Sequence, residues 1–593
     1  MIPVIDKSSI TVIIGIVFFR GGTMNLAHEY IKDYREYTSY EDLKANCRLT
    51  APENFNFAYD IVDRYARETP EKRALVWIDD NSDEAKVFTF ADISRESKRA
   101  AYWLAQKGIK KGDMVMLMLR RRYEWWFLLP ALHRIGAVAI AASDQLLKTD
   151  IEYRTNAADV KMIISYDNPH VQEEIEKAME KSPTVKFLVT VGPDREGWIN
   201  FHKEYETVDP EFPRPVGEAA THNSDPMLMY FTSGTSGYPK MVLHDFTYPI
   251  GHIITAKYWH CVVDDGLHLT IAETGWAKAS WGKIYGQWIC GTAQFVYDMN
   301  MLKPDKMLTL ISKYGLTTFC APPTVYRFLV RQDLSKYDLS KCQRFSTAGE
   351  ALNDEVYDKW LEQTGKRIYE GYGQSESAVI CGNFMDFKDA PVRPGSMGRP
   401  SPAYDVEILN PNDKPVPNGE VGELCIHVDK GHPFGLLTGY HKDISLTAEA
   451  FDGGFYHTGD NVYRDDDGYI WFVGRKDDII KSSGYRISPF EVESVLQKHP
   501  AVMECAVTGV EDAKRGQIVK ATIVLVPAYA DKDKKEMEVE ISTFAKENTA
   551  MYKIPRIYEF VTELPKTISG KIRRVEIREK DKGKDIEKIK QDF

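Results

Sequence analysis

The chain has 593 residues and a formal net charge of -11 at pH 7, and 43% of its residues are hydrophobic and 27% charged. The composition is that of a globular protein, and the length predicts roughly three to four domain-sized units rather than a single core. The acidic balance argues against sequence-independent binding to nucleic acid, which requires a dominant basic face.

The N-terminal segment from Ile10 to Phe19 is apolar but only ten residues long. That is about half of the ~20 residues that a membrane-spanning helix needs. A signal-peptide core is an alternative, yet residues 20–24 contain no small-residue cleavage pattern. We interpret residues 1–23 as an unpacked extension, take Met24 as the working start, and predict no membrane span.

Eight cysteines are scattered along the chain, with neither a C-x-x-C pair nor a Cys/His pair at zinc spacing. This arrangement favours a reducing compartment over an oxidising one. We therefore predict a cytoplasmic protein without a structural metal. A homo-oligomer is possible, and the sequence does not decide the oligomeric state.

Predicted strands and helices alternate through the first part of the chain. Strands are expected at residues 74–78, 114–119, 137–142, 160–165 and 185–191, with helices between most of them. This spacing is typical of βαβ units and of a mainly parallel sheet. A second α/β stretch begins after Asn223, with further strands near 317–321 and 345–348.

The pattern changes after Gly398, where short strands and Pro/Gly turns predict a β-rich subdomain. A charged junction follows near residues 474–479, and the rest resembles a separate α+β module. Its helices are expected at 489–498 and after Asp531, and its strands at 501–510, 519–526 and 557–561. We predict an α/β fold: a large N-terminal domain (24–476) of βαβ-type subdomains plus the β-rich subdomain, and a small mobile α+β C-terminal domain (477–593).

A loop rich in glycine and hydroxyl residues runs from Thr232 to Lys240 (TSGTSGYPK), after an apolar run that predicts a buried strand. Backbone N–H groups, hydroxyls and an ammonium in such a loop can converge on a polyphosphate. It is not a Walker loop, because only two residues separate its glycines and Lys240 does not directly follow the second one. The string resembles the phosphate loop of the AMP-forming adenylating enzymes, which include acyl-CoA synthetases, luciferases and peptide-synthetase adenylation domains. The resemblance implies that ATP phosphates are contacted by Thr232, Ser233, Gly234, Thr235, Ser236, Gly237 and Lys240.

A second motif spans Gly371 to Glu376 (GYGQSE). It fails as a dinucleotide fingerprint, because Glu376 stands where the third glycine belongs. It resembles the family's Tyr-Gly-x-Thr-Glu, in which an aromatic ring lies against adenine, a hydroxyl contacts phosphate and a carboxylate binds Mg²⁺. The resemblance gives these roles to Tyr372, Ser375 and Glu376, with Gly373 beside them in the nucleotide site. Ser375 replaces the usual Thr but keeps the hydroxyl.

Two shorter segments resemble the rest of the family's nucleotide site. Gly349, Glu350 and Ala351 follow a predicted strand and resemble the segment whose backbone borders adenine. Asp460, in Tyr-His-Thr-Gly-Asp, resembles the aspartate that accepts both ribose hydroxyls, although a lone T-G-D is more often a turn. Arg475, fifteen residues later, occupies the position of a family arginine that also contacts ribose.

The C-terminal signatures imply a moving domain. By resemblance, Asp477 is the hinge about which the small domain rotates. Arg486 would contact phosphate, and Gly484 with Tyr485 would border the pantetheine chain of coenzyme A, because glycine has no side chain to block a narrow tunnel. The closing Pro-Lys-Thr-Ile-Ser-Gly-Lys571 resembles the motif whose second lysine bridges the substrate carboxylate and the α-phosphate, although basic C-terminal stretches are usually solvated.

Trp276 lies where the family places an aromatic gate between the acyl and CoA channels. Its neighbours in the expected acyl pocket are Trp259, Lys278, Trp281 and Cys320, although a lone Trp or Cys is more often core and a lone Lys solvated. Three tryptophans within 23 residues would occupy volume that a long chain needs. We therefore predict a short or branched acid of roughly four to eight carbons, with gradual discrimination at ~1–3 kcal/mol per methylene.

Together these motifs resemble the medium-chain acyl-CoA synthetases most closely. The resemblance implies that a small-molecule carboxylic acid reacts with ATP and Mg²⁺ to give acyl-AMP and pyrophosphate, and that coenzyme A then takes the acyl group and releases AMP. An aryl-CoA ligase or a luciferase-like enzyme on the same fold is the alternative. A non-catalytic binding protein is disfavoured because Lys571, Glu376 and Asp460 are all present.

Overall fold

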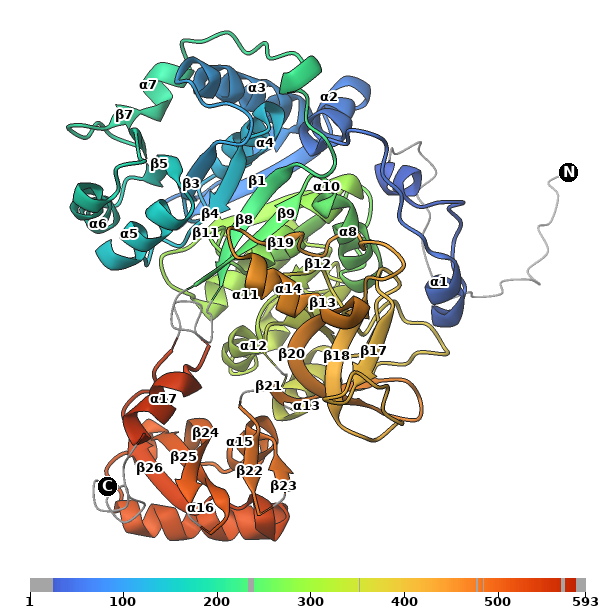
Figure 1. Ribbon diagram of the computed structural model, residues 1–593, viewed down its shortest axis with the longest axis vertical. Helices are drawn as coiled ribbons and strands as arrows, with labels where there is room; N and C mark the ends of the chain where they lie inside the picture. The colour runs from blue at the N-terminus through green and yellow to red at the C-terminus, as the bar shows by residue number, and fades with distance from the viewer. Residues whose placement is uncertain are drawn as a thin grey trace, which may run out of the picture.

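The computed structural model describes residues 25–232, 239–350, 352, 354–475, 478–483, 485–512, 514–566 and 571–582. Strands in these residues form four sheets. Two large sheets and a small antiparallel sheet make up an N-terminal body, and the fourth sheet lies in a C-terminal body at one end of the long axis (Figure 1). The predicted fold class, a large α/β N-terminal part and a smaller α+β C-terminal part, is confirmed.

The first large sheet has eight strands in the order β19-β9-β8-β4-β3-β5-β6-β7. Its centre is parallel, with β4 paired to both β3 and β8. All five residues of β3 are buried, as expected for a parallel strand covered on both faces. The strands are β3 (Met114–Met118), β4 (Val138–Ala141), β5 (Val160–Tyr166), β6 (Phe187–Val191), β7 (Ile199–Asn200), β8 (Pro226–Thr232), β9 (Lys240–Asp245) and β19 (Gly439–Tyr440).

The second large sheet has nine strands in the order β16-β15-β14-β13-β12-β10-β11-β1-β2. Strands β12, β13 and β14 pair in parallel, so their carboxyl ends, at Cys320, Ala348 and Tyr372, meet at one edge. The strands are β1 (Arg73–Asp79), β2 (Lys86–Thr89), β10 (Leu267–Thr270), β11 (Ala293–Asp298), β12 (Thr318–Cys320), β13 (Arg344–Ala348), β14 (Ile368–Tyr372), β15 (Cys381–Gly382) and β16 (Arg399–Pro400).

Helices flank the two large sheets (Figure 1). Helix α3 begins with a capping box in which Thr89 and Asp92 satisfy each other's backbone N–H groups. Helix α4 ends at Gly136, whose φ of 82° is readily adopted by glycine. The helices of this body are α1 (Tyr40–Asn46), α2 (Asp63–Glu68), α3 (Phe90–Gln106), α4 (Trp125–Ile135), α5 (Lys148–Ala157), α6 (Pro169–Ala178), α7 (Phe201–Tyr205), α8 (Tyr248–Ile254), α9 (Lys278–Gly282), α10 (Tyr285–Ile289), α11 (Pro304–Tyr314), α12 (Pro323–Leu329), α13 (Asp354–Thr364) and α14 (Ile444–Ala450).

The β-rich subdomain is a four-stranded antiparallel sheet in the order β17-β18-β20-β21. Its strands are β17 (Val406–Leu409), β18 (Gly422–His427), β20 (Phe455–Arg464) and β21 (Ile470–Arg475). The C-terminal body packs three helices around a five-stranded sheet. Its elements are β22 (Ile480–Ser482), β23 (Tyr485–Ile487), α15 (Pro489–Leu496), β24 (Val502–Asp512), β25 (Gly516–Leu525), α16 (Lys534–Asn548), β26 (Ile557–Val561) and α17 (Arg574–Asp581).

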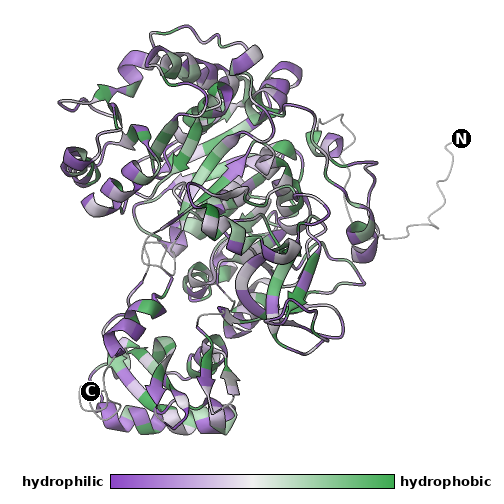
Figure 2. Ribbon diagram, in the orientation of Figure 1, coloured by the Kyte–Doolittle hydropathy of each residue, from purple (hydrophilic) through white to green (hydrophobic). Residues whose placement is uncertain are grey.

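The distribution of hydropathy follows these layers. Figure 2 shows apolar residues concentrated in the strands of the large sheets and polar residues on the outer helices. Two extended apolar cores fill the N-terminal body and a separate one fills the C-terminal body. Because each body has its own core, each can keep its internal packing if the two change their relative orientation.

The residues on the two sides of the phosphate loop lie on paired strands. β8 and β9 pair antiparallel, with Thr232 opposite Lys240. Residues 1–24 and 583–593 lie outside the described residues, so the prediction of an unpacked N-terminal extension is not addressed by the fold.

Candidate active site

The centre of the candidate site is Asp460 in β20, which is 3% exposed. Its Oδ2 accepts hydrogen bonds from the hydroxyl of Tyr372 and from Nε2 of Gln374, the latter at 2.7 Å. Arg475 Nη1 lies 3.4 Å from Oδ1 of the same carboxylate. Asp460 and Arg475 are direct partners in the β20–β21 ladder, which explains physically why fifteen residues separate them.

The electrostatics of Asp460 are dominated by burial. Burial raises the pKa of Asp460, while Arg475, the hydrogen bonds from Tyr372 and Gln374, and the charge of Lys571 act in the opposite direction. Burial also raises the pKa of the Tyr372 hydroxyl well above its ordinary value. A buried carboxylate of this kind binds hydrogen-bond donors strongly, because little water competes for it.

Glu376 follows Tyr372 by four residues and is held by contacts of its side chain and of its backbone. Its Oε1 accepts a hydrogen bond from the Tyr440 hydroxyl at 3.2 Å, and its backbone carbonyl accepts one from Leu437 N–H at 2.7 Å. Burial raises the pKa of Glu376, and the Lys240 ammonium lowers it in part. The Lys240 ammonium also lies 5.2 Å from the centre of the Tyr440 ring. Tyr440 is thus a neighbour of both the Glu376 carboxylate and the Lys240 ammonium.

The loop residues themselves are only partly described. Thr232 and Lys240, which close the hairpin, face each other, and Ser375 is fixed through its backbone carbonyl, 2.8 Å from Nε2 of buried His244. The loop residues outside the described part of the chain are Ser233, Gly234, Thr235, Ser236, Gly237 and Tyr238.

The adenine-bordering segment follows the carboxyl end of β13. Gly349 has a φ of 102°, a conformation that favours glycine. The Lys278 ammonium donates to the carbonyl of Ala348 at 2.6 Å, so this lysine reaches the nucleotide segment as well as the expected acyl pocket. Burial lowers the pKa of Lys278, and Lys571 lowers it further. Glu350 is partly buried next to Gly349, and Ala351 lies outside the described residues.

Trp259 and Trp281 pack against the strand that carries the Tyr372 motif. Their indole N–H groups donate to the carbonyls of Glu370 and Ser377, each at 3.1 Å, and their rings meet nearly perpendicularly with centroids 6.1 Å apart. A Cβ placed on Gly371 would lie 2.4 Å from the Trp259 ring, and one on Gly373 2.3 Å from the Trp281 ring. The two indoles therefore occupy the space directly beside these glycines.

Trp276 is more accessible than the other two tryptophans. Its loop is attached to the turn after β3, because Glu273 lies 3.1 Å from Arg121 and the Thr274 hydroxyl donates to the carbonyl of Arg120. Cys320, at the carboxyl end of β12, is 1% exposed. The sequence alone could not decide whether Cys320 lines the acyl pocket or belongs to the hydrophobic core, and its burial favours the core.

In the C-terminal body, the described residues around Tyr485, where coenzyme A is expected, are aromatic and basic. Tyr485 is 51% exposed and stacks on Tyr552 with centroids 4.2 Å apart and an interplanar angle of 14°. A small cavity of about 40 Å³ beside them is also lined by Arg515 and Arg556. The predicted residues outside the described part are Asp477, Gly484 and the side chain of Arg486.

Lys571 lies close enough to the nucleotide cleft to affect it. Its charge lowers the pKa of both Asp460, in β20, and Lys278, at the start of α9. The described residues on its two sides contact each other: Lys566 forms a bridge with Ile572, and Arg573 N–H donates to the Pro565 carbonyl at 2.8 Å. The structure therefore brings Lys571, Asp460 and Lys278 to one region.

Sequence reasoning missed several residues that hold this arrangement. Gln374 donates to Asp460 and accepts a hydrogen bond from the Tyr456 hydroxyl at 2.9 Å. Tyr440 orients Glu376 from β19, more than sixty residues away in the sequence. Gln374 stood inside the recognised motif and could have been proposed, whereas the position of Tyr440 depends on the β9–β19 pairing.

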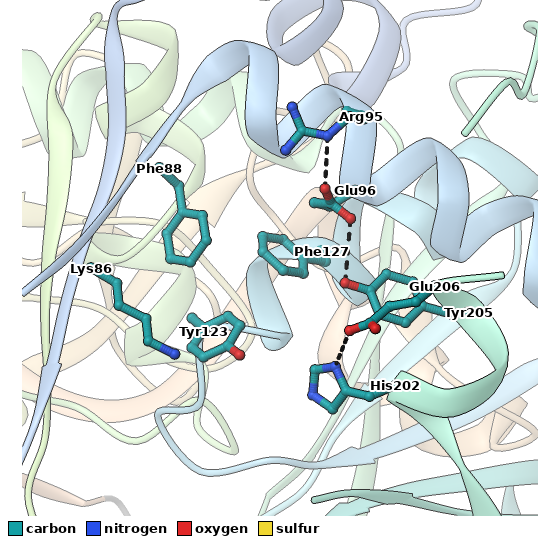
Figure 3. A pocket seen from close by; sticks show the side chains of 9 residues that line it. All are labelled: Lys86, Phe88, Arg95, Glu96, Tyr123, Phe127, His202, Tyr205 and Glu206. Atoms are coloured by element: carbon teal, nitrogen blue, oxygen red, sulfur yellow. Dashed lines mark hydrogen bonds and ion pairs between the residues drawn. The ribbon is translucent and has the colours of Figure 1, made fainter. Parts of the chain in front are cut away.

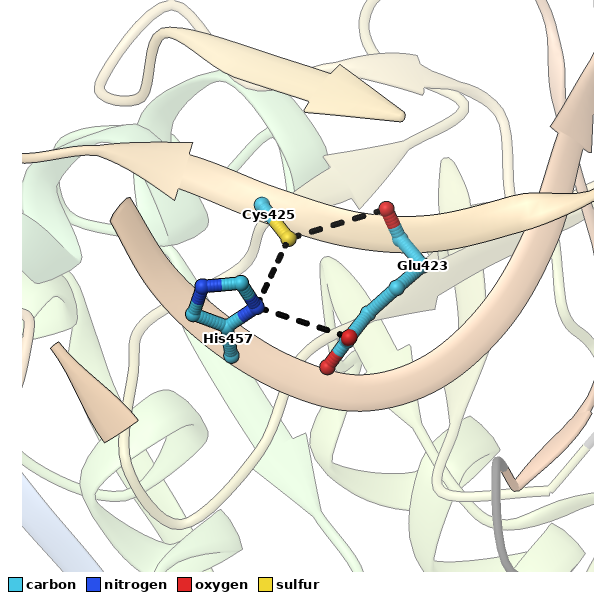
Figure 4. Close-up of side chains that lie close together, drawn as sticks. All are labelled: Glu423, Cys425 and His457. Carbon is cyan, nitrogen blue, oxygen red and sulfur yellow. Dashed lines mark hydrogen bonds and ion pairs between the residues drawn. The ribbon is translucent and has the colours of Figure 1, made fainter. Parts of the chain in front are cut away.

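A cluster of Glu423, Cys425 and His457 supports the turn that ends at Asp460 (Figure 4). The Glu423 carboxylate accepts from Gly459 N–H at 2.9 Å and lies 3.4 Å from His457 Nδ1, and Cys425 Sγ lies 3.5 Å from the same nitrogen. The atoms of these three side chains that could bind a metal ion lie within 4.8 Å of one another. Hydrogen bonding to Glu423 raises the pKa of His457, so a hydrogen-bonded ion pair accounts for the cluster.

A cavity of about 230 Å³ opens elsewhere in the N-terminal body (Figure 3). Four aromatic rings and several charged groups line it: Lys86, Phe88, Arg95, Glu96, Tyr123, Phe127, His202, Tyr205 and Glu206. Most of these charges pair with each other, as in Arg95–Glu96 at 2.8 Å and His202–Glu206 at 3.4 Å. None of the predicted site residues lines this cavity.

Comparisons with known proteins identify the family. The family model for AMP-binding enzymes matches residues 62–441, and the model for the AMP-binding enzyme C-terminal domain matches residues 491–571. Mouse acyl-coenzyme A synthetase ACSM3 is 40% identical over 562 residues, covering 93% of this chain and 95% of its own. The human protein of the same name is 39% identical, covering 92% of this chain and 93% of its own.

Solved structures show the same fold. The anthranilate CoA ligase AuaEII in complex with anthranoyl-AMP superposes with a TM-score of 0.80 at 27% identity, covering 90% of this chain and 98% of that chain. An acyl-CoA synthetase from Brucella canis gives a TM-score of 0.69 at 30% identity, covering 92% of this chain and 99% of that chain.

The comparisons correct one prediction. The mouse and human relatives are named as mitochondrial proteins, so the prediction of a cytoplasmic location is wrong. The reason is that free thiols indicate a reducing environment and do not say which compartment provides it. All eight cysteines, each within the described residues, are indeed free. Among the described helices, none combines the length and apolar character that crossing a membrane requires.

Proposed function

This chain belongs to the AMP-binding enzymes, and on that premise we propose how its residues carry out two half-reactions on a short, medium-length or branched carboxylic acid. The chain is an AMP-forming acyl-CoA synthetase. In the first half-reaction a carboxylate oxygen attacks the α-phosphorus of ATP, giving acyl-AMP and releasing pyrophosphate. In the second, the thiol of coenzyme A attacks the acyl carbon, forming the thioester and releasing AMP and the thiol proton.

The observation that carries the nucleotide assignment is the convergence of three groups on Asp460. Tyr372, Gln374 and Arg475 come from two different sheets and surround one buried carboxylate. We assign to Asp460 the two ribose hydroxyls. Because its Oδ2 already accepts from Tyr372 and Gln374, the ribose would use Oδ1 and replace one of these two donors. Tyr372 then provides the ring beside adenine, and Gly349 with its neighbours provides the backbone edge.

Lys240 and the phosphate loop are assigned to the triphosphate, with Ser375 supplying a further hydroxyl. Glu376 fits a divalent cation: it is a carboxylate whose pKa is raised by burial and only partly offset by Lys240, and a hard cation prefers such oxygen ligands. When bound there, Mg²⁺ would neutralise phosphate charge. Tyr440 would orient the carboxylate by its hydrogen bond to Oε1.

We assign to Lys571 the charge that develops on the α-phosphate during the attack. This assignment is supported by the electrostatic effect of Lys571 on Asp460 and Lys278. Transition-state charge is stabilised most by groups that are already oriented before the reaction, and this task requires no covalent bond to the lysine.

The second half-reaction is proposed to follow a rotation of the C-terminal body about Asp477, with the domain boundary at residues 476–477. Separate cores in the two bodies permit such a rotation. Arg486 would contact phosphate, and Gly484 and Tyr485 would border the pantetheine chain. Arg515 and Arg556, together with the Tyr485–Tyr552 stack, offer cations and a flat ring surface suited to the nucleotide end of coenzyme A.

The size of the acid follows from Trp259 and Trp281. Both rings lie within 3 Å of a Cβ built on Gly371 or Gly373, so they occupy the volume beside the strand that carries the reacting groups. We propose that Trp276 gates the passage between the acyl pocket and the CoA channel, and that the pocket accepts roughly four to eight carbons, with each extra methylene changing the transition-state energy by ~1–3 kcal/mol.

An aryl-CoA ligase remains the second candidate, because the neighbour with a TM-score of 0.80 is an anthranilate CoA ligase. A luciferase-like reaction differs in that it consumes oxygen and emits light.

One incubation separates these candidates. The protein is mixed with ATP, Mg²⁺ and coenzyme A and with acetate, butyrate, isobutyrate, hexanoate, octanoate, palmitate or benzoate, and AMP and thioester are measured. We expect AMP and thioester in equal amounts, with the highest rate between butyrate and octanoate. A maximum at palmitate would refute the pocket assignment, and a maximum at benzoate would favour the aryl ligase.

A further inference from the structure

Helix α17 follows Lys571 after two residues and is held to the rest of the C-terminal body by ion pairs along its length. At its start, Arg574 forms a bidentate pair with Glu493 of α15, with both Nη2–carboxylate oxygen distances at 2.6 Å. Glu493 is 5% exposed, and its other contact is Val507 N–H at 2.7 Å. The first turn of α17 is therefore fixed to both α15 and β24.

The far end of α17 is anchored in the interior. Asp581 lies 2.7 Å from the ammonium of Lys520 in β25, and Glu559 of β26 lies 2.7 Å from the same ammonium. All three side chains are at most 5% exposed. A buried cation with two carboxylates is costly to break from one side, so this end of the helix is rigidly attached to the sheet.

The middle of α17 contacts the segment where the two bodies join. Arg578 pairs with Asp478, and Arg574 Nη1 lies 3.9 Å from the same carboxylate. The Asp478 side chain is 14% exposed. Its backbone N–H donates to the carbonyl of Arg475 at 3.1 Å, and Arg475 is the partner of Asp460. One residue thus contacts the ribose-side strand through its backbone and α17 through its side chain.

We propose that Asp478 and Arg578 are positioning residues that couple the orientation of the C-terminal body to the placement of Lys571 over the α-phosphate. The inference rests on the proposed function. Residue 478 is the first described residue after the proposed hinge, so its backbone direction changes when the hinge turns. The ion pair passes that change to α17, which begins at Arg574, three residues after Lys571.

This arrangement predicts a selective defect. Lys571 acts in the first half-reaction only, so loss of the Asp478–Arg578 pair should slow acyl-AMP formation and leave thioester formation from supplied acyl-AMP unchanged. A displacement of the lysine by about 1 Å can cost up to roughly 100-fold in rate. A residue that only stabilises the fold would slow both steps together.

The test uses the full-length enzyme with two separate assays. Acyl-AMP formation is followed by pyrophosphate release in a single turnover, and the second step by thioester formation from synthetic acyl-AMP and coenzyme A. For Arg578→Gln we expect a loss of about 10- to 100-fold in the first assay and none in the second. Arg578→Lys, which keeps the charge, should recover part of the loss.

Lys582→Gln is the matched control, because it removes a positive charge from the end of the same helix at a side chain that is 73% exposed. It should change neither assay. In the double variant Asp478→Asn/Arg578→Gln the loss should equal that of Asp478→Asn alone, since that substitution already removes the pair with Arg578. Equal slowing of both half-reactions, no slowing of either, or additive losses in the double variant would overturn the proposal.

The outcome is distinguishable from failure of the proposed function. If the wild-type enzyme formed no acyl-AMP, or if Lys571→Ala formed it at the wild-type rate, the proposed function itself would be wrong. If Lys571→Ala slowed the first step and Arg578→Gln did not, only the coupling through Asp478 would be refuted.

Discussion

The assignment of Asp460 to the ribose hydroxyls can be tested by replacing Asp460 with Asn and by removing the hydroxyls from the nucleotide. The substitution keeps the shape of the side chain and removes its charge. In the proposed complex Asp460 accepts from both ribose hydroxyls. A hydrogen bond to a charged group contributes about 1.5–3 kcal/mol and a neutral one about 0.5–1.5 kcal/mol, so two such bonds lose about 2–3 kcal/mol in total. At 1.36 kcal/mol per tenfold change, AMP affinity should fall roughly 30- to 150-fold.

The assay is calorimetric titration with AMP and with 2′,3′-dideoxy-AMP, which lacks both hydroxyls. Asp460→Asn should weaken AMP binding and leave the affinity for the dideoxy nucleotide nearly unchanged. Asp467→Asn is the matched control, because its carboxylate is 63% exposed at the turn of the same hairpin. Equal weakening of both nucleotides would show that Asp460 acts through the fold, and the ribose assignment would be refuted.

Three further predictions follow from burial and charge. Trp259→Ala should move the preferred acid to longer chains, at a cost of about 3–5 kcal/mol in stability for the buried indole; an unchanged profile of pyrophosphate release across acids would contradict the pocket assignment. Glu376→Gln should raise the Mg²⁺ concentration needed for half-maximal acyl-AMP formation, and an unchanged requirement would place the metal elsewhere. Burial lowers the pKa of His252 from its usual 6.5 to about 3, so its contribution to stability is present above pH 6.5 and is lost as the pH falls from there towards 3. When the pH falls from 7.5 to 5.5, the free energy of unfolding should therefore decrease by about 1.4 kcal/mol less in His252→Phe than in the wild type. Denaturant unfolding at the two pH values measures this difference, and an equal decrease in both proteins would contradict the assigned burial.

Much of the fold was predictable, because its central strands are buried on both faces and read as continuous apolar runs. The strand expected at 557–561 coincides with β26, and the helix expected from 489 begins at Pro489 in α15. The hairpin around the phosphate loop was not predictable in the same way, since the antiparallel pairing of β8 with β9 depends on partners across the sheet.

The candidate site divides along the same line. Motif residues such as Asp460 and Arg475 could be proposed from their resemblance to the family's motifs, and the structure shows that they are partners in one hairpin. Tyr440 could not, because only the approach of β19 to β9 brings its hydroxyl to Glu376. For Trp259 the sequence did not decide between a place in the lining of the acyl pocket and a place in the core. In the structure its side chain is fully buried and lies directly beside Gly371.

The measurement that tests the central claim most directly is a single-turnover assay of Lys571→Ala with α-labelled ATP and butyrate. The wild-type enzyme should produce acyl-AMP and pyrophosphate. The variant should do so roughly 100- to 1,000-fold more slowly, as for loss of one oriented group that stabilises transition-state charge, while converting supplied acyl-AMP to thioester at the wild-type rate. Acyl-AMP formation at full speed by the variant, or ADP and orthophosphate as wild-type products, would contradict the account.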